Sequence, residues 1–344
     1  MWIIGCDFHS GFQQVAIFDN RTGEMEEKKL RHPAEATQFY RGLAGQVRVG
    51  MESGCPSQWF RKLLAECGHQ LWIGDAARIR AAETRSQKTD RRDAELILKL
   101  MLEERFPRIW VPTEAERDLR QLLMDRHHRM RMRTKVKNQL QALALNQGVQ
   151  KGRGLWSEQG LQQLRELPMM EHASRRRDQL LQLLGELNAQ ILALDVVVRR
   201  QAEARDDARR LMTHPGVGPQ TALGMVLTVG EVGRFATSKQ VASYLGLTPR
   251  EHSSGGKQRL GHISKQGSSF MRFLLVEAGQ TAVRGDVELQ RVYRRLAAKK
   301  SRGVAKVMVA RRLAVRLYWM LRKQATYAEL ARHAGKPGSF RGEQ

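Results

Sequence analysis

Apolar and polar positions along the first hundred or so residues are arranged in short runs separated by turns. Three such runs, joined by short turns, predict an antiparallel meander of strands: WIIGCD, QQVAIFDN and GEMEEKKLRH. The pattern then predicts a helix over 33–44, the strand QVRVGME, a helix over 57–67, the strand QLWIGD and a helix from about Asp90. This alternation predicts an α/β domain over 1–110, with a mixed sheet and helices on its faces.

Beyond Pro112 the chain has few turn residues, which predicts a long helical segment over 111–205. Six apolar residues within it follow one another at heptad spacing: Leu180, Leu184, Leu187, Ile191, Leu194 and Val198. This spacing is typical of a coiled-coil seam. The seam would pair either with another helix of the same chain or with a second copy, and the pattern does not distinguish the two. We expect a homo-oligomer, a dimer or a tetramer.

Glycines return after Leu211, and the pattern predicts a mainly α-helical domain over 206–330 followed by a flexible tail over 331–344. Gly216 and Gly218 form a turn between apolar segments. Such a turn occurs in helix-hairpin-helix elements, where backbone amides approach a phosphate closely. An ordinary connection between two helices is an equally valid interpretation. Leu313, Leu317 and Leu321 form an apolar stripe at helical spacing.

The charge of the chain indicates a polyanionic partner, because the formal net charge is +24 and the sequence pI is about 10.7. No stretch approaches the roughly 18 consecutive apolar residues of a membrane span. We therefore expect a cytoplasmic protein that binds nucleic acid and no membrane. Within 120–137 the basic residues have little acidic compensation, which favours a phosphate-facing surface over a merely solvated helix face. The candidates in this segment are Arg129, Arg131, Arg133 and Lys135.

Four carboxylates are candidates for a metal site. Asp7 and Glu52 each end a predicted strand, whereas Asp90 and Asp93 are three residues apart at a predicted helix start, where they would share one face. Together they could hold one or two Mg²⁺ ions, which prefer oxygen ligands and sites shared with phosphates. The alternative for Asp90 and Asp93 is an ordinary acidic helix start with an N-cap.

Several segments in a fixed order resemble one known family. They are IIGCDFH, VGMESG, KTDRRDAELI, LMTHPGVGPQTA and YLGLTPREHSSGGKQRLGHISKQGSSFMRFLLVEAG. The chain resembles insertion-sequence transposases that combine a RuvC-like, ribonuclease-H-like DEDD domain with a C-terminal serine-containing domain, the bridge-RNA-guided recombinases. The resemblance implies that Asp7, Glu52, Asp90 and Asp93 bind Mg²⁺, and that the partners are donor and target DNA and a guide RNA.

The same resemblance implies a serine nucleophile for the attack on the DNA phosphate. The serine directly before glycine is Ser254, with Ser253 beside it as the competing assignment. Nearby cations could stabilise charge on the phosphate: Lys257, Arg259, Lys265 and Arg272. Without the resemblance, this segment is equally typical of a polar loop. In the family the serine and the carboxylates of one site come from different protomers.

Two other functions are compatible with the residues alone. A metal-dependent, junction-resolving nuclease would use the four carboxylates to activate water and would not need Ser254. A non-catalytic nucleic-acid scaffold would use the acids as helix caps and the basic helices for binding. The leading hypothesis is a transposase that cuts and rejoins the DNA of a mobile element.

Overall fold

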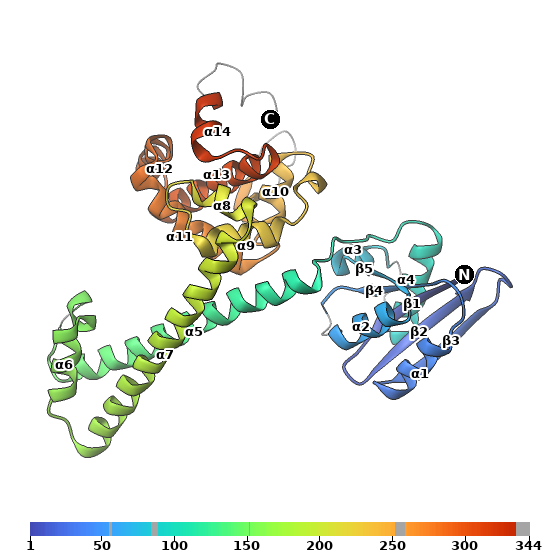
Figure 1. Ribbon diagram of the computed structural model, residues 1–344, viewed down its shortest axis with the longest axis horizontal. Coiled ribbons are helices and arrows are strands. Elements are labelled where there is room, and N and C mark those ends of the chain that lie inside the picture. Colours follow the sequence, from blue (N-terminus) through green and yellow to red (C-terminus); the bar gives the residue numbers. More distant parts are fainter. Residues whose placement is uncertain (55–56, 84–88, 151, 252–258, 335–344) are drawn as a thin grey trace. The chain divides into compact units, whose positions relative to one another are not determined.

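The structure, a computed structural model, describes residues 1–54, 57–83, 89–150, 152–251 and 259–334 (Figure 1). The chain divides into two compact units, Met1–Val111 and Pro112–Gln344. Each unit has its own hydrophobic core.

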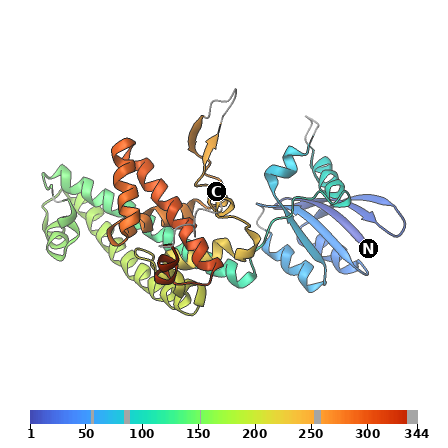
Figure 2. The same ribbon diagram turned by 90° about the horizontal axis from the view of Figure 1, so that it is seen from above.

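The N-terminal unit contains the predicted mixed sheet of five strands, in the order β3-β2-β1-β4-β5 (Figures 1 and 2). The first three strands are antiparallel, and β4 and β5 run parallel to β1. The elements of this unit are β1 (Trp2–Phe8), β2 (Phe12–Asp19), β3 (Met25–Arg31), α1 (Ala34–Gly42), β4 (Val47–Glu52), α2 (Gln58–Glu66), β5 (Gln70–Gly74), α3 (Ala76–Ala81) and α4 (Asp90–Leu102). The predicted fold class is confirmed.

Helices cover both faces of this sheet. Side chains alternate along a strand, so that Ile3 of β1 points to one face and its neighbour Ile4 to the other. Ile4 packs in a core with α1 and α2, which contribute Tyr40 and Phe60. Ile3 packs with Leu98 of α4 on the opposite face. The sheet is therefore the middle layer of three.

One helix of this unit was missing from the sequence prediction. It is α3, whose first turn is capped by Asp75: the carboxylate accepts the backbone N–H groups of Ala77 and Arg78 at 2.9 and 3.1 Å. The helix is only six residues long, too short to give a recognisable amphipathic period.

The second unit begins with a helical hairpin in which α5 (Glu114–Asn146) and α7 (Glu171–Glu203) lie side by side, joined through η1 (Arg153–Trp156) and α6 (Glu158–Glu166) (Figure 1). Leu180, Leu184 and Leu187 of the predicted seam pack against Val136 and Leu140 of α5. These seam residues thus pair within the chain.

Among the described helices, α7 has the length and composition that would allow it to cross a membrane. A long helix of a coiled coil can have the same length and apolar composition, and Leu184 and Leu187 on the seam of α7 are buried against α5. The observation is therefore weak evidence for a membrane.

A helical bundle around α13 completes the second unit. Its elements are α8 (Asp206–Met212), α9 (Pro219–Val229), η2 (Val232–Arg234), α10 (Ser238–Tyr244), β6 (Pro249–Glu251), β7 (Leu260–Ile263), α11 (Ser269–Gly285), α12 (Val287–Lys299), α13 (Arg302–Arg322) and α14 (Tyr327–Ala334). The predicted stripe of Leu313, Leu317 and Leu321 lies on α13 and is buried in this core.

A buried carboxylate ties four segments of the bundle together. Asp286, at the start of α12, accepts the Leu289 N–H at 2.8 Å and the Tyr327 hydroxyl at 2.7 Å, and it pairs with Arg316 of α13. The buried ring of His214 lies 4.0 Å from it. Burial alone would raise the pKa of Asp286, but these donors outweigh burial and the pKa is lowered.

We expect Asp286→Asn to destabilise the protein by about 3–5 kcal/mol, because it breaks a buried ion pair and leaves Arg316 without its buried partner. Because the pKa is lowered in the folded state, the carboxylate stabilises the fold at any pH above 3.8, its ordinary pKa. This contribution is lost as the pH falls through the lower pKa of the folded state. Urea unfolding at pH 7 measures the loss, which should shrink below pH 3.8.

The matched control is Glu288→Gln, since Glu288 pairs with the same Arg316 but its side chain is 57% exposed. We expect a loss of at most about 1 kcal/mol there. Equal losses in the two variants would show that burial of Asp286 contributes nothing.

Candidate functional site

The sheet places two of the predicted carboxylates side by side. Cys6 of β1 pairs with Met51 of the parallel strand β4, so the next residues lie at the same edge of the sheet: Asp7, the last but one residue of β1, and Glu52, the last residue of β4. Cys6 and Met51 are buried on the face covered by α1 and α2. Because side chains alternate, Asp7 and Glu52 point to the other face, which α4 covers.

The other two predicted carboxylates lie in the first turn of α4. Thr89 is the N-cap residue, and its hydroxyl accepts the Arg92 N–H at 3.4 Å. The alternative in which an aspartate itself caps this helix is therefore wrong. Asp90 and Asp93 are inside the helix, where their negative charge also interacts favourably with the N-terminal end of its dipole.

Glycines let α4 lie close to the sheet. Gly5 of β1 and Gly50 of β4 are paired in the register. A Cβ atom at Gly5 would lie 2.2 Å from the carbonyl oxygen of Ala94 and 2.5 Å from the backbone N of Leu98. The absence of a side chain at Gly5 therefore lets the backbone of α4 at Ala94 and Leu98 lie directly against the middle of β1.

We expect Gly5→Ala to destabilise the protein by about 1–3 kcal/mol, because the new methyl group meets the backbone of α4, which has to move away. The same displacement should carry Asp90 away from Asp7 and weaken metal binding. Thermal unfolding and titration calorimetry with Mg²⁺ measure the two effects.

Gly50→Ala is the control, since its Cβ atom would meet the Sδ atom of Met101, the far end of a flexible side chain. A smaller loss is expected there, because Met101 can take another rotamer. If both variants lose stability and metal affinity equally, close packing at Gly5 does not position the site.

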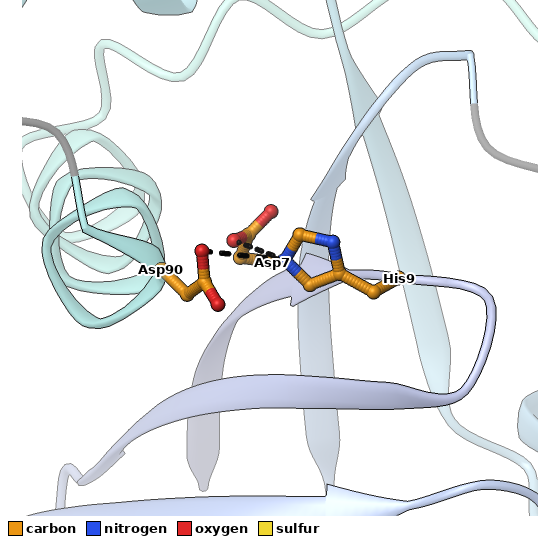
Figure 3. A group of neighbouring side chains, drawn as sticks. All are labelled: Asp7, His9 and Asp90. Carbon is orange, nitrogen blue, oxygen red and sulfur yellow. Dashed lines mark hydrogen bonds and ion pairs between the residues drawn. The ribbon is translucent and has the colours of Figure 1, made fainter.

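A histidine joins the carboxylates of the two elements (Figure 3). The Nε2 atom of His9 lies 3.0 Å from Oδ2 of Asp7 and 3.6 Å from Oδ1 of Asp90. Its ring stacks on Phe12, with the centroids 4.6 Å apart. His9 is not among the residues predicted from the sequence, although its position two residues after Asp7 was a usable signal, because residues i and i+2 of a strand share a face.

The donor atoms of this cluster fit a divalent cation. One atom each from Asp7, His9 and Asp90 lies within 4.8 Å of the others. Burial raises the pKa of Asp7, and the charges of Asp93 and Asp90 raise it further, although His9 acts in the opposite direction. A half-buried carboxylate near two other acids is stabilised by a nearby positive charge. Carboxylate and imidazole groups are ordinary ligands for such an ion.

The other two predicted ligands, Glu52 and Asp93, are not part of this trio. Glu52 accepts a hydrogen bond at 3.1 Å from a terminal nitrogen of Arg80 in α3, so an arginine neutralises it in this structure. Asp93 is close enough to Asp7 to affect its pKa. The structure thus brings Asp7 and Asp90 together, with Asp93 near Asp7, whereas Glu52 at the end of the neighbouring strand pairs with Arg80.

The predicted nucleophile lies outside the described residues, as do Ser253 and Lys257. The strands on either side, β6 and β7, form a two-stranded antiparallel ribbon. Arg259 and Lys265 are exposed near it. Arg272 has a structural position instead: its guanidinium donates to the carbonyl oxygens of Leu245, Gln266 and Gly267 at 3.3, 2.6 and 3.2 Å.

The four basic candidates on α5 fall on two sides of the helix. Arg129 donates to Asp125 at 3.2 Å and also to Gln190 of α7, and Arg133 donates to Asn188 of α7 at 3.3 Å. These two arginines therefore join the hairpin. Arg131 and Lys135 are exposed and line a hollow shared with α9 and α11.

The two glycines of the α8–α9 turn differ in role. Gly216 has φ +82°, and a Cβ atom there would lie 2.4 Å from the backbone N of Ala282, so this glycine is needed for packing against α11. No atom lies within 4 Å of a Cβ atom placed at Gly218, which lines the same hollow as Arg131. Both glycines line the hollow, but only Gly216 is packed against α11.

Two family models match the chain. Residues 4–147 match a transposase domain, DEDD_Tnp_IS110, and residues 208–294 match the domain described as Transposase IS116/IS110/IS902 family. The first covers the carboxylates, and the second covers the segment with Ser254.

Curated relatives agree with these matches. A probable family 20 transposase of Pseudomonas aeruginosa is 28% identical over 82% of this chain and 84% of its own length. The transposase for insertion sequence element IS1111A of Coxiella burnetii is 29% identical over 58% of this chain and 56% of its own. A pilin gene-inverting protein of Moraxella bovis is 28% identical over 49% and 44%.

These matches, in the order in which the two domains occur along the chain, agree with a carboxylate cluster at the end of β1. The chain belongs to the IS110/IS116 family of transposases, enzymes that act on the DNA of mobile elements.

Proposed function

We propose that this transposase cuts and rejoins DNA through Ser254, with Mg²⁺ held by Asp7, Glu52, Asp90 and Asp93. The observation that carries the metal part is the approach of Asp7 and Asp90 to the same His9 nitrogen, at 3.0 and 3.6 Å. A divalent cation, when bound there, stabilises negative charge on phosphate oxygens during phosphodiester chemistry. Domain matches on both segments support the pairing of this site with the serine.

The side chains of the cluster have separable tasks in this proposal. Asp7 and Asp90 supply oxygen ligands from a strand end and a helix start, two rigid elements. Glu52, which pairs with Arg80 in this structure, would be a further oxygen ligand for the cation, and Arg80 would then face the phosphate. His9 holds the Asp7 carboxylate in place through its hydrogen bond.

Ser254 performs the transfer itself. Its Oγ atom forms a bond to phosphorus, one P–O bond of the DNA breaks, and the departing strand takes up a proton as a free hydroxyl. A hydroxyl of a second strand then attacks the phosphoserine, so that Ser254 is released and no phosphodiester bond is lost. Arg259 and Lys265 are exposed and add positive charge that would stabilise the charge of the phosphate.

Covalent trapping tests this sequence of steps. Wild-type protein with Mg²⁺ and a labelled duplex from the ends of the element, nicked beside the cleavage site, should give a protein–DNA adduct. The adduct should survive denaturing electrophoresis and disappear with protease. Free labelled ends without adduct at any time point would instead support the nuclease that uses water.

We further propose that Ser254 and the carboxylates of one site come from different protomers. Mixing Asp7→Ala protein with Ser254→Ala protein should then restore part of the activity that each lacks alone. A mixture that stays inactive at every ratio contradicts shared sites. The α5–α7 seam is occupied within the chain at Leu180, Leu184 and Leu187, so another surface has to join the protomers.

A guide RNA from the element itself completes the proposal. The net charge of +24 suits RNA as well as DNA. RNA that copurifies with the protein should match noncoding sequence beside the gene, and ribonuclease treatment should abolish site-specific recombination. Site-specific activity that survives this treatment would contradict guidance.

A further inference from the structure

A hollow in the second unit brings together three elements that are distant in the sequence: α5, the start of α9 and α11. Its volume is about 880 Å³. The three helices contact one another in pairs through α9, near the region where α5 and α7 come together (Figure 1). All of it lies within one compact unit.

Aromatic rings form one wall of this hollow. The ring of His127 lies 4.9 Å from that of Phe270 and 5.0 Å from that of Phe273, centroid to centroid. Phe273 is 46% exposed although it is a large apolar side chain. Burial lowers the pKa of His127, and Arg131, His128 and Arg126 lower it further, which favours the uncharged ring at pH 7. The wall is thus an aromatic surface open to solvent.

Cations stand beside the aromatic wall. His127, Arg131 and Lys135 are spaced by four residues and share one face of α5. Arg126 also lines the hollow, but its guanidinium donates two hydrogen bonds to Asp195 of α7, at 2.7 and 3.2 Å. Arg126 therefore fixes the hairpin, whereas the exposed Arg131 and Lys135 face the hollow.

The charge of the hollow favours an anionic occupant. Glu277 is the one acidic side chain among its lining residues, and its carboxylate accepts the Gln280 amide at 3.1 Å. A neutral aromatic wall next to cations is the combination that binds single-stranded nucleic acid, because bases stack on rings while cations contact the phosphates. A base pair inside a duplex does not offer its face for such stacking.

We propose that this hollow binds unpaired nucleotides, with bases stacked on Phe273 and His127 and phosphates held by Arg131 and Lys135. The inference rests on the assignment of the chain as a nucleic-acid enzyme, and it names the form of nucleic acid that this surface takes. The unpaired strand is either DNA or RNA, because the bases of both offer the same faces for stacking on aromatic rings. Gly218, beside the wall, leaves its backbone accessible to the same strand.

The test uses the full chain in EDTA, so that binding is measured without cleavage and its outcome is independent of the metal and serine chemistry. Fluorescence anisotropy follows labelled 12-nucleotide DNA and RNA strands of one sequence, and the matching duplex. We expect Phe273→Ala to weaken binding of single strands about tenfold or more while duplex binding changes less than about twofold. Phe273→Tyr should restore binding, since it keeps the ring.

The cations give a second, independent measurement. Arg131→Ala and Lys135→Ala should weaken single-strand binding and each reduce the slope of log affinity against log salt by about one. Arg175→Ala on α7 is the matched control, because it removes an exposed cation outside the hollow and should leave single-strand affinity within about twofold.

Each outcome decides the proposal. If the substitutions weaken the binding of RNA more than that of DNA, or the reverse, the result identifies the nucleic acid that the hollow binds and supports the proposal. Unchanged single-strand binding in Phe273→Ala and Lys135→Ala overturns it, as does an equal loss for duplex. If poly-glutamate displaces the strand from the wild type but not from Phe273→Ala, the hollow binds an acidic protein instead.

Discussion

Replacement of Ser254 by alanine is expected to reduce DNA strand transfer by about 10³-fold or more, because the substitution removes the hydroxyl that the proposed mechanism uses as the nucleophile. Binding of DNA should stay within about threefold of wild type, since one uncharged hydroxyl contributes little beside many phosphate contacts. Strand transfer on a supercoiled plasmid carrying both element ends measures the first effect, and gel retardation measures the second.

Ser253→Ala is the matched control, because it removes the same hydroxyl one residue earlier. We expect it to keep activity within about fivefold of wild type, because its hydroxyl takes no part in the proposed reaction. If Ser253→Ala is the inactive variant and Ser254→Ala is active, the nucleophile is the earlier serine. If both cleave at the wild-type rate, water performs the reaction and the serine mechanism is wrong.

Replacement of Asp7 by asparagine is expected to abolish measurable Mg²⁺ binding and to reduce strand transfer by about 10³-fold, since charge stabilisation by the cation is worth several kcal/mol. The metal-free variant should be at least as stable as the wild type. The pKa of Asp7 is raised by burial and by its acidic neighbours, so the folded state binds this proton more tightly than the unfolded state does. Stability is then lost as the pH rises through the folded-state pKa, and the neutral amide avoids that loss.

Titration calorimetry with Mg²⁺ and thermal unfolding in EDTA at pH 7.5 test the two parts separately. Glu26→Gln is the control, because its carboxylate lies on β3 and is 59% exposed. It should bind Mg²⁺ as the wild type does. If Asp7→Asn still binds Mg²⁺, the metal site is not at the end of β1. If the variant is strongly destabilised, Asp7 has a structural role.

Much of the N-terminal unit was predictable because its signals are local. Alternation along β1 and β4 placed Asp7 and Glu52 at strand ends, and acids three residues apart at a helix start placed Asp90 and Asp93 on one face. The heptad spacing on α7 likewise predicted a seam before its partner was known. These patterns follow from the fixed periods of strands and helices, which the residues of a single segment reveal.

The parts that could not be predicted involve contacts between distant segments. His9 is an ordinary residue until β1 and α4 bring Asp7 and Asp90 to the same nitrogen. Gly216 and Gly218 look alike in the sequence, yet only Gly216 is pressed against α11.

The basic run of α5 shows the same division most clearly. Its composition predicted an anionic partner, since charge is additive along a chain and acts at long range. Which cations meet that partner depended on packing: α7 engages Arg129 and Arg133, whereas Arg131 and Lys135 stay exposed beside Phe273. The residue types and their spacing along the chain determine whether a segment is a helix or a strand and what charge it carries. The neighbours of a side chain are fixed only when helices remote in the sequence bury their apolar faces against one another, because hydrophobic burial is non-directional and many pairings satisfy the same pattern.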